Sequence, residues 1–428
     1  MFSSLFQFFA SAFKQPDIRK KLLITALVLF FFRLSAHIPA AGIDTTLLKN
    51  LFVSSPILSL LDVFSGGTLV NFSVMALGLG PYISASIIVQ LLQVVVPKLE
   101  ELSKEGEYGQ EQIDRYTRYL TLPLASFQAF AMYLLLKNQG VITGLNPLNL
   151  TALIITMVAG SVFAVWLGDL ITEYGVSNGV SFLIFAGIIA RLPVVVSQSL
   201  TTIEVQDFLK TVTFVVVLLL VIGLIVFMNE AIRKIPINYS RRSRAIGTTF
   251  SYLPLRLNQA NVIPIIFAVS VVMMPSLLSQ FLVNAADPRL KALGNFFISD
   301  FSPRSFWYNF VYFALVVGFT FFYTAVIFNP EKIAENLQKS GGFIPGIRPG
   351  SQTVSYLNDI LGKITLAGAI FLGLVAIMPS LVQGVFGVSN LAVGGTGVLI
   401  VVSVVLEVMR SLESQLVMKK YDRFFEGS

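Results

Sequence analysis

The sequence predicts an all-α integral membrane protein with ten transmembrane helices in two pseudo-symmetric, inverted five-helix halves. Only 12% of its 428 residues are charged and 55% are hydrophobic, whereas about 25% of a soluble domain is charged. A helix rises about 1.5 Å per residue, so about 20 residues cross a hydrocarbon core about 30 Å thick. Five runs of about this length or longer contain no charged residue: Val63–Pro97, Thr211–Asn229, Val262–Ala286, Trp307–Pro330 and Ile364–Leu406.

The ten predicted spans each cover about 18 to 25 residues. The direction of insertion follows from Lys and Arg, which are retained on the cytoplasmic side. With the N-terminus inside, 21 Lys and Arg lie on the cytoplasmic side and 7 outside, with Arg33 and Arg410 inside spans. Both termini are therefore predicted to be cytoplasmic. The spans begin near Leu22, Ser73, Tyr119, Ala152, Val180, Thr211, Val262, Phe306, Ile364 and Leu391.

The spans divide the chain into a short N-terminal segment, two halves and a tail. The N-terminal segment has the basic-then-apolar order of a signal peptide, but a chain that re-enters the membrane many times needs no separate address, so we expect an uncleaved first span. The predicted parts are a cytoplasmic N-terminus 1–21, an N-terminal half 22–199, a C-terminal half 200–410 with cytoplasmic loops 229–259 and 329–363, and a cytoplasmic tail 411–428.

The second span of each half is interrupted near its start. The interruptions are "LGLGPYI" at Leu77–Ile83 and "NVIPIIF" at Asn261–Phe267. Ordinary kinks are one interpretation, because Gly and Pro are common in membrane helices. Paired breaks in inverted halves instead indicate a pathway, where irregular backbone faces water rather than lipid. The uncharged stretch before Lys98 is too long for one span, so segment 55–72 is predicted to dip into the protein from outside.

Residue types in the chain exclude several kinds of chemistry. Cysteine is absent and His37 is the only histidine, which excludes thiolate chemistry and histidine-built metal sites. "GGTGVLI", which begins at Gly394, lacks the lysine of a phosphate-binding loop. Asp169 and Glu173 are spaced like an acid pair, but an interfacial position lets both stay hydrated. We therefore predict no cofactor and no enzyme; a secondary transporter remains an alternative, against which the lack of buried carboxylates counts.

Several long motifs resemble the SecY family, the channel subunits of the bacterial protein-export machinery. The resemblance covers nearly the whole chain. The motifs are "RLSAHIPAAGID", "DVFSGGTLVNFSVMALGLGPYISASIIVQLL", "RYTRYLT", "ITEYGVSNGVSFLIFAGIIARLP", "PLRLNQANVIPIIFA", "FNPEKIAENLQKSGGFIPGIRPG" and "GGTGVLIVV".

The resemblance implies an hourglass pore between the two halves. Such a pore opens sideways into lipid between the second and third helices on one side and the seventh and eighth on the other. Unfolded secretory polypeptides cross it, and hydrophobic segments leave it sideways into the cytoplasmic (inner) membrane. The family's pore ring corresponds to Leu79, Ile83, Val180, Ile184, Ile266 and Ile400, and the recognisable part of its plug to Phe64, Ser65, Gly66 and Gly67.

The resemblance also implies partners. Members of the family associate with small SecE and SecG subunits and dock either a ribosome or the SecA ATPase on the two large cytoplasmic loops. Arg348 in "GIRPG" matches the key arginine of one loop. The other loop is basic, as a partner rich in phosphate or carboxylate requires, although these arginines could also serve only to set topology. Its arginines are Arg241, Arg242, Arg244 and Arg256.

Some residues depart from the family pattern. The loop Asn238–Asn258 is a few residues shorter than is typical, and Gln110, Glu111 and Gln112 stand where the family is more basic. Tyr174 and Ser177 replace an Arg and a Gly of the family motif. These differences concern individual contacts with partners rather than the expected channel.

Overall fold

The computed structural model of the chain describes residues 13–40, 67–138, 140, 146–201, 208–239, 251–283, 287–299, 301, 305–386 and 395–426. By their internal contacts the residues form two compact units. Unit 1 comprises Met1–Glu204, Met273–Pro303 and Ser389–Ser428, and unit 2 comprises Val205–Val272 and Arg304–Val388.

Each of the ten predicted spans corresponds to a helix. Their bounds are α2 (Pro16–Ala36), α5 (Gly80–Val95), α7 (Glu107–Asn138), α8 (Pro147–Tyr174), α9 (Gly179–Thr201), α10 (Phe208–Glu230), α11 (Ile263–Leu282), α13 (Phe306–Ile327), α15 (Ser351–Phe386) and α16 (Gly395–Glu426). Several extend well beyond the predicted apolar core, because a helix that leaves the hydrocarbon can continue through polar residues. The second span differs at its start: residues 73–79 form turns, and α5 begins only at Gly80.

In unit 1 the helices pack in a chain of neighbours. Helix α8 contacts α2, α7 and α9; α5 contacts α7; and α9 contacts α16. The coil before α5 is pressed against α8, where a Cβ built on Gly160 would lie 2.0 Å from the carbonyl oxygen of Val74. Only glycine allows this approach. Phe72 and Ala76 of the coil, together with Ala129 and Met157 of the helices, belong to the buried apolar cluster at this crossing.

Helix α5 ends in a sharp bend. The chain turns by 100° into α6 (Pro97–Lys104), at a proline that cannot continue the hydrogen-bond ladder of the preceding helix. Helix α6 packs against the start of α7, where a Cβ on Gly109 would lie 1.7 Å from the carbonyl oxygen of Leu102. A short α12 (Pro288–Ser299) also belongs to unit 1.

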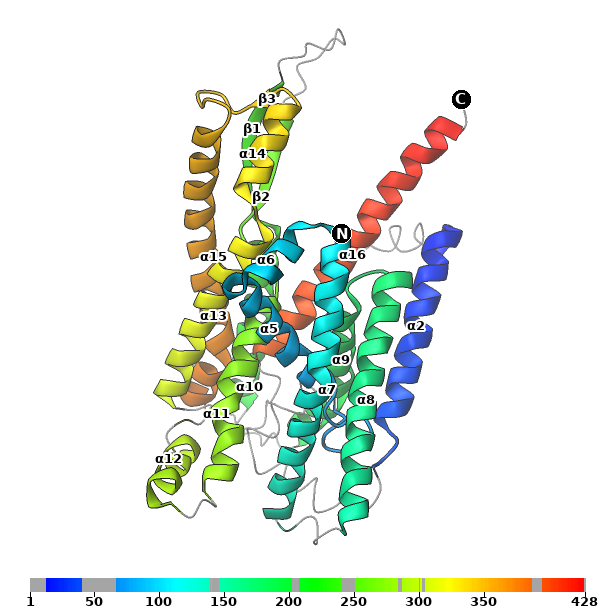
Figure 1. Ribbon diagram of the computed structural model, residues 1–428, viewed down its shortest axis with the longest axis vertical. Helices are drawn as coiled ribbons and strands as arrows, with labels where there is room; N and C mark the ends of the chain where they lie inside the picture. Colours follow the sequence, from blue (N-terminus) through cyan, green and yellow to red (C-terminus); the bar gives the residue numbers. More distant parts are fainter. Residues whose placement is uncertain are drawn as a thin grey trace. The chain divides into compact units, whose positions relative to one another are not determined.

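Unit 2 carries a small sheet in the two large loops. Strands β1 (Ile232–Tyr239) and β2 (Ser251–Arg256) pair antiparallel, with Ile235 opposite Leu253, and β3 (Gly342–Phe343) pairs with the other edge of β1. This sheet and α14 (Pro330–Lys339) lie at one end of α13 and α15 (Figure 1). A buried apolar cluster joins them to α15; it contains Ile235, Leu255, Ile344, Leu357 and Leu361.

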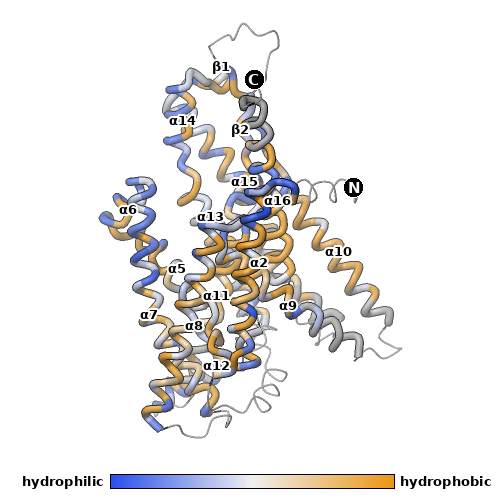
Figure 2. Tube along the Cα trace, turned by 90° about the vertical axis from the view of Figure 1, so that its right-hand side faces the viewer, coloured by the Kyte–Doolittle hydropathy of each residue, from blue (hydrophilic) through white to orange (hydrophobic). Residues whose placement is uncertain are grey.

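Hydropathy along the chain identifies the membrane-crossing parts. Among the described residues, four helical stretches are each long and apolar enough to cross a bilayer: Glu107–Lys137, Pro147–Tyr174, Phe306–Lys339 and Ser351–Met378. The bent pair α5 and α6 adds a fifth if it is counted as one span, and α9, α10 and α11 contain shorter apolar helices. Hydrophilic residues gather on α6, α14 and the first part of α7, whereas α10 is almost entirely hydrophobic (Figure 2).

The two tryptophans of the chain both lie on exposed helix surface. Trp166 of α8 is 53% exposed and stacks on Phe163; Trp307 at the start of α13 is 60% exposed and contacts Phe306 and Phe310. Trp307 therefore lies near the end of a membrane helix, a position typical of tryptophan in the lipid headgroup region.

Candidate functional site

The first candidate pore residues lie at the start of α5. Gly78 has a φ of +52°, in the left-handed region, and Leu79 directly after it is the N-cap of the helix. Pro81 occupies the first turn, where its missing N–H costs no helical hydrogen bond. The Ile83 N–H donates to the Leu79 carbonyl at 3.0 Å, so the two candidate side chains lie one turn apart. Both are buried.

The next pair lies at the start of α9. The Asn178 side chain accepts a hydrogen bond from the Ser181 N–H at 3.1 Å and thereby caps the helix. Val180 is half-buried and Ile184 is buried one turn later. Helix α8 approaches very closely here: a Cβ on Gly179 would lie 1.8 Å from the Gly168 carbonyl oxygen, and a Cβ on Gly168 would lie 3.4 Å from Cγ2 of Val180. Two glycines therefore set the position of this first turn.

The two remaining candidates lie on α11 and α16. Asn261, with φ +52°, precedes α11, and the Ile266 N–H donates to the Val262 carbonyl at 3.2 Å. Ile266 is buried in unit 2, and Phe267 beside it packs edge-to-face on Phe319 and Tyr323 of α13. Ile400 lies on α16 of unit 1 and is fully buried.

Within unit 1 the structure thus places five of the six candidates on three helices. Leu79 is the N-cap of α5 and Ile83 lies in its first turn, Val180 and Ile184 lie on α9, and Ile400 lies on α16. Helices α5 and α9 both contact α8, and α9 contacts α16. The sixth, Ile266, belongs to unit 2.

Of the candidate plug residues, Phe64, Ser65 and Gly66 lie outside the described residues. Gly67 is described, with a φ of +81°, and the aliphatic part of the Arg191 side chain lies 3.2 Å from where its Cβ would be. The coil that follows is fixed to the end of the first span: the Ala40 N–H donates to the Phe72 carbonyl at 2.8 Å, and the Val74 N–H to the Ile38 carbonyl at 2.9 Å.

Two of the candidate partner-binding arginines are described. Arg256 is exposed at the end of β2, opposite Ile232. Arg348 is exposed in a turn between Gly346 and Gly350, whose φ values are +81° and +101°. Its carbonyl accepts a hydrogen bond from the Thr353 hydroxyl at 3.0 Å, which anchors the turn to α15. Arg241, Arg242 and Arg244 lie outside the described residues.

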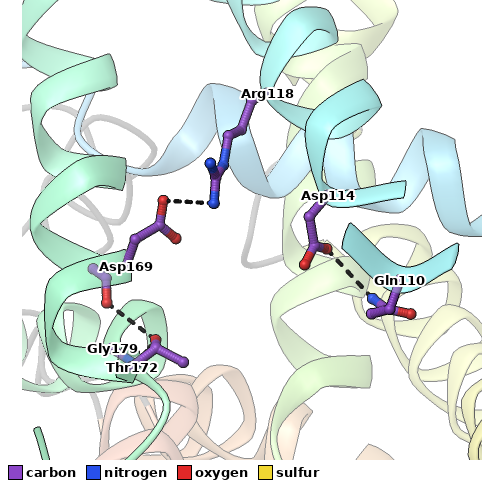
Figure 3. Close-up of polar contacts among 7 residues, drawn as sticks. Gln110, Asp114, Arg118, Asp169, Thr172 and Gly179 are labelled. Atoms are coloured by element: carbon purple, nitrogen blue, oxygen red, sulfur yellow. Dashed lines mark hydrogen bonds and ion pairs between the residues drawn. The ribbon is translucent and has the colours of Figure 1, made fainter. Parts of the chain in front are cut away.

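The acidic residue Asp169 has a partner on a neighbouring helix. Arg118 of α7 lies 3.0 Å from its carboxylate, and Asp114 one turn earlier on α7 contacts Gln110 (Figure 3). Glu173 is exposed. Asp169 therefore ties α8 to α7, which fits the structural interpretation of the Asp169 and Glu173 spacing better than catalysis. Among the described residues, no group of three or more His, Cys, Asp or Glu is placed to hold a metal ion.

Two polar junctions were missed by the sequence reasoning. In unit 2 the buried Asn258 side chain donates to Oδ1 of Asn229 at 2.8 Å and to the Asn261 carbonyl at 3.3 Å. In unit 1 the Ser177 hydroxyl donates to Glu407 at 3.1 Å. For Ser177 a signal was available, because it replaces a glycine of the family motif. For Asn258 no pattern in the sequence indicated a buried partner.

Together these features define a multi-pass helical membrane protein with interrupted, closely packed helices. The SecY family profile matches residues 73–409. The chain is 40% identical to the protein translocase subunit SecY of Streptomyces coelicolor over 435 residues, covering 97% of this chain and 99% of that protein.

Solved structures agree on the fold. A structure described as "The structure of a protein conducting channel" superposes with a TM-score of 0.63 at 19% identity, covering 94% of this chain and 92% of the other. Sec61 in the canine ribosome-channel complex from the endoplasmic reticulum gives a TM-score of 0.61 at 18% identity, covering 95% and 93%.

The chain belongs to the SecY family. The predicted all-α membrane fold and the predicted protein-conducting function are confirmed by this membership. The family consists of translocation channels rather than enzymes, so the transporter and enzyme alternatives no longer apply.

Proposed function

We propose that the chain seals its channel with a ring of six aliphatic side chains, formed by Leu79, Ile83, Val180, Ile184, Ile266 and Ile400. The observation that carries the proposal is the pair of helix starts at α5 and α11, where a left-handed residue is followed by a proline and then by a ring residue. Irregular backbone at membrane depth is tolerated only where it is buried or faces a water-filled space. An aliphatic constriction excludes water and so blocks small ions while closed.

The two matched helix starts also support two inverted halves, 22–199 and 200–410, with the pathway between them. In this proposal an unfolded polypeptide enters from the cytoplasm and displaces the plug around Phe64–Gly67. It then passes the ring, while sufficiently apolar segments leave sideways between the helices. In this proposal both termini are cytoplasmic, as the excess of Lys and Arg on that side supports. The membrane is the bacterial cytoplasmic membrane, which the similarity to the SecY subunit of a bacterium supports.

Replacing a ring isoleucine with a polar residue tests the ring. Ile83→Asn and Ile400→Asn should each raise the resting ion conductance of the purified channel in a planar bilayer, because water then enters the constriction. They should also let precursors with weakened signal sequences pass. Ile370→Asn is a matched control, since Ile370 is an exposed apolar residue of α15. Resting conductance unchanged from the parent protein in both ring variants would rule the ring out.

For the partners, we propose SecE and SecG as associated subunits and a ribosome or the SecA ATPase as the source of driving energy. One solved structure of similar fold is a ribosome-channel complex. The exposed Arg348 lies in a turn whose two glycines adopt the left-handed conformation and whose Arg348 carbonyl accepts a hydrogen bond from the Thr353 hydroxyl. Arg348→Glu should impair motor-driven export while assembly is retained, with Lys363→Glu as a control at an exposed residue. Normal export by the Arg348 variant would remove its assigned role.

A further inference from the structure

The turn between α8 and α9, residues 175–178, is unusually constrained for a loop. The Gly175 N–H donates to the Ile171 carbonyl at 2.8 Å, and the Gly179 N–H donates to the Thr172 hydroxyl at 2.9 Å. A Cβ on Gly175 would lie 2.7 Å from the Thr25 hydroxyl of α2. Hydrogen bonds to α8 therefore fix both ends of the turn, and α2 packs closely against Gly175. Because Gly179 begins α9, the conformation of the turn also sets the position of the first turn of α9, which carries Val180.

This turn is fastened to α16 by two hydrogen bonds. The Ser177 hydroxyl donates to Oε1 of Glu407 at 3.1 Å, and the Ser411 hydroxyl donates to the Val176 carbonyl at 2.6 Å. We refer to these two hydrogen bonds as the turn clasp. They bridge residues more than 200 positions apart in the chain, but all four residues lie in unit 1.

Apolar packing surrounds the turn clasp. Val176, Leu412 and Leu416 are buried together with Ile18 at the start of α2. Lys21 of α2 donates to the Gln415 side chain at 3.3 Å, and Gln415 in turn donates to the Ser411 hydroxyl at 3.3 Å. The partial exclusion of water strengthens hydrogen bonds such as that between Ser177 and the Glu407 carboxylate, because neither partner is fully solvated.

The turn clasp lies on the same face of α16 as Ile400. At about 100° per residue, Glu407 and Ser411 fall within about 20° of Ile400 around the helix axis. The face of α16 that presents Ile400 is thus the face fixed to the turn that begins α9. A rotation of α16, or a slide along its axis, would break both hydrogen bonds.

We propose that Ser177, Glu407 and Ser411 are positioning residues that hold α16 in register with the start of α9, and so keep Ile400 aligned with Val180 and Ile184 in the resting channel. This inference rests on the proposed aliphatic ring. It assigns the turn clasp a role in keeping the channel closed, beyond its contribution to folding.

The test removes the hydroxyls of Ser177 and Ser411 and measures the ion conductance of the resting channel in a planar bilayer. The double variant Ser177→Ala, Ser411→Ala should raise resting ion conductance about tenfold to a hundredfold, since each lost hydrogen bond shifts a two-state equilibrium by about threefold to tenfold. Each single variant should give a smaller increase. Ser177→Thr and Ser411→Thr keep a hydroxyl and should stay close to the parent protein. Ser414→Ala is the matched control, because Ser414 is exposed on the same helix and its hydroxyl donates to the Ser411 carbonyl within that helix rather than to the turn.

The outcomes separate this inference from the proposed ring. Ile400→Asn is measured in parallel. If Ile400→Asn leaks and the double alanine variant does not, the turn clasp has no positioning role and the ring stands. If neither leaks, the ring itself is wrong and the inference falls with it. Should the double variant fail to fold, the single Ser177→Ala variant at the half-buried turn decides by the same measurement: conductance equal to the parent overturns the proposal.

Discussion

The starts of α5 and α11 reach the same backbone geometry by different means. Gly78 and Asn261 both have a φ of +52°, and each precedes a helix with a proline in its first turn. Before α5 the turns are closed by backbone hydrogen bonds: the Gly78 N–H donates to the Met75 carbonyl at 2.8 Å and the Gly80 N–H to the Leu77 carbonyl at 3.2 Å. Before α11 the Asn258 side chain holds the Asn261 carbonyl and is itself bonded to Asn229.

This difference teaches that a break in a membrane helix can be stabilised in two ways. At α5 a glycine removes the steric cost of the left-handed conformation, so no side chain is needed. At α11 an asparagine tolerates that conformation and a neighbouring buried amide satisfies the free carbonyl. The first solution should be sensitive to added bulk, and the second to the loss of a polar partner.

The largest effect is expected for Gly78→Val. A β-branched residue in the left-handed region, at a buried position, should destabilise the protein by about 3 kcal/mol through backbone strain and overpacking. The measurement is the thermal unfolding midpoint of the purified protein in mild detergent. Gly78→Asn is the matched variant, because Asn adopts this conformation readily, and it should unfold closer to the parent. Equal midpoints for Val and Asn would show that φ at this position does not matter.

A smaller loss is expected for Asn258→Ala. The variant leaves the buried side-chain oxygen Oδ1 of Asn229 without this donor, which should lower the free energy of unfolding by about 2 kcal/mol. The exchange rate of the backbone amide hydrogens at the start of α11 should rise as well, because the Asn261 carbonyl also loses its side-chain donor. Gln259→Ala, at the half-buried neighbour, provides the control. Slow exchange retained in the Asn258 variant would contradict the role given to the amide.

The smallest effect is expected at Asn261. Asn261→Gly should be nearly neutral, whereas Asn261→Ala should cost about 1 kcal/mol, because alanine lacks the tolerance of asparagine for positive φ. Both are followed by the unfolding midpoint. An alanine variant more stable than the glycine variant would mean that backbone entropy, not the left-handed conformation, dominates here.

The existence of the ten helices could be predicted because apolar length decides membrane insertion. Their ends could not. Helix α7 begins at Glu107, well before the predicted Tyr119, because its polar first turns pack against α6 and continue the helix outside the apolar run. Helix α15 likewise begins at Ser351 rather than Ile364. The β1–β2 hairpin was not predicted, although alternation in "IRKIPINY" is typical of a strand with one buried face.

For the site, the sequence indicated positions but not contacts. The breaks before Ile83 and Ile266 could be predicted because Gly and Pro residues interrupt apolar runs there. The individual ring residues came only from resemblance, because most residues of any membrane helix are aliphatic. The bonds of Ser177 and Asn258 join residues through tertiary packing, which no local pattern encodes.

Trp166 and Trp307 are exposed, one in each unit, so they can serve as intrinsic fluorescent probes of depth in the membrane. Bromine atoms at known positions along lipid tails quench tryptophan emission only at short range. In variants that each keep one of the two tryptophans, a series of such lipids would therefore locate α8 and α13 along the bilayer normal without any added label. Since cysteine is absent, a single introduced thiol could carry a third, independent dye on whichever helix is to be followed.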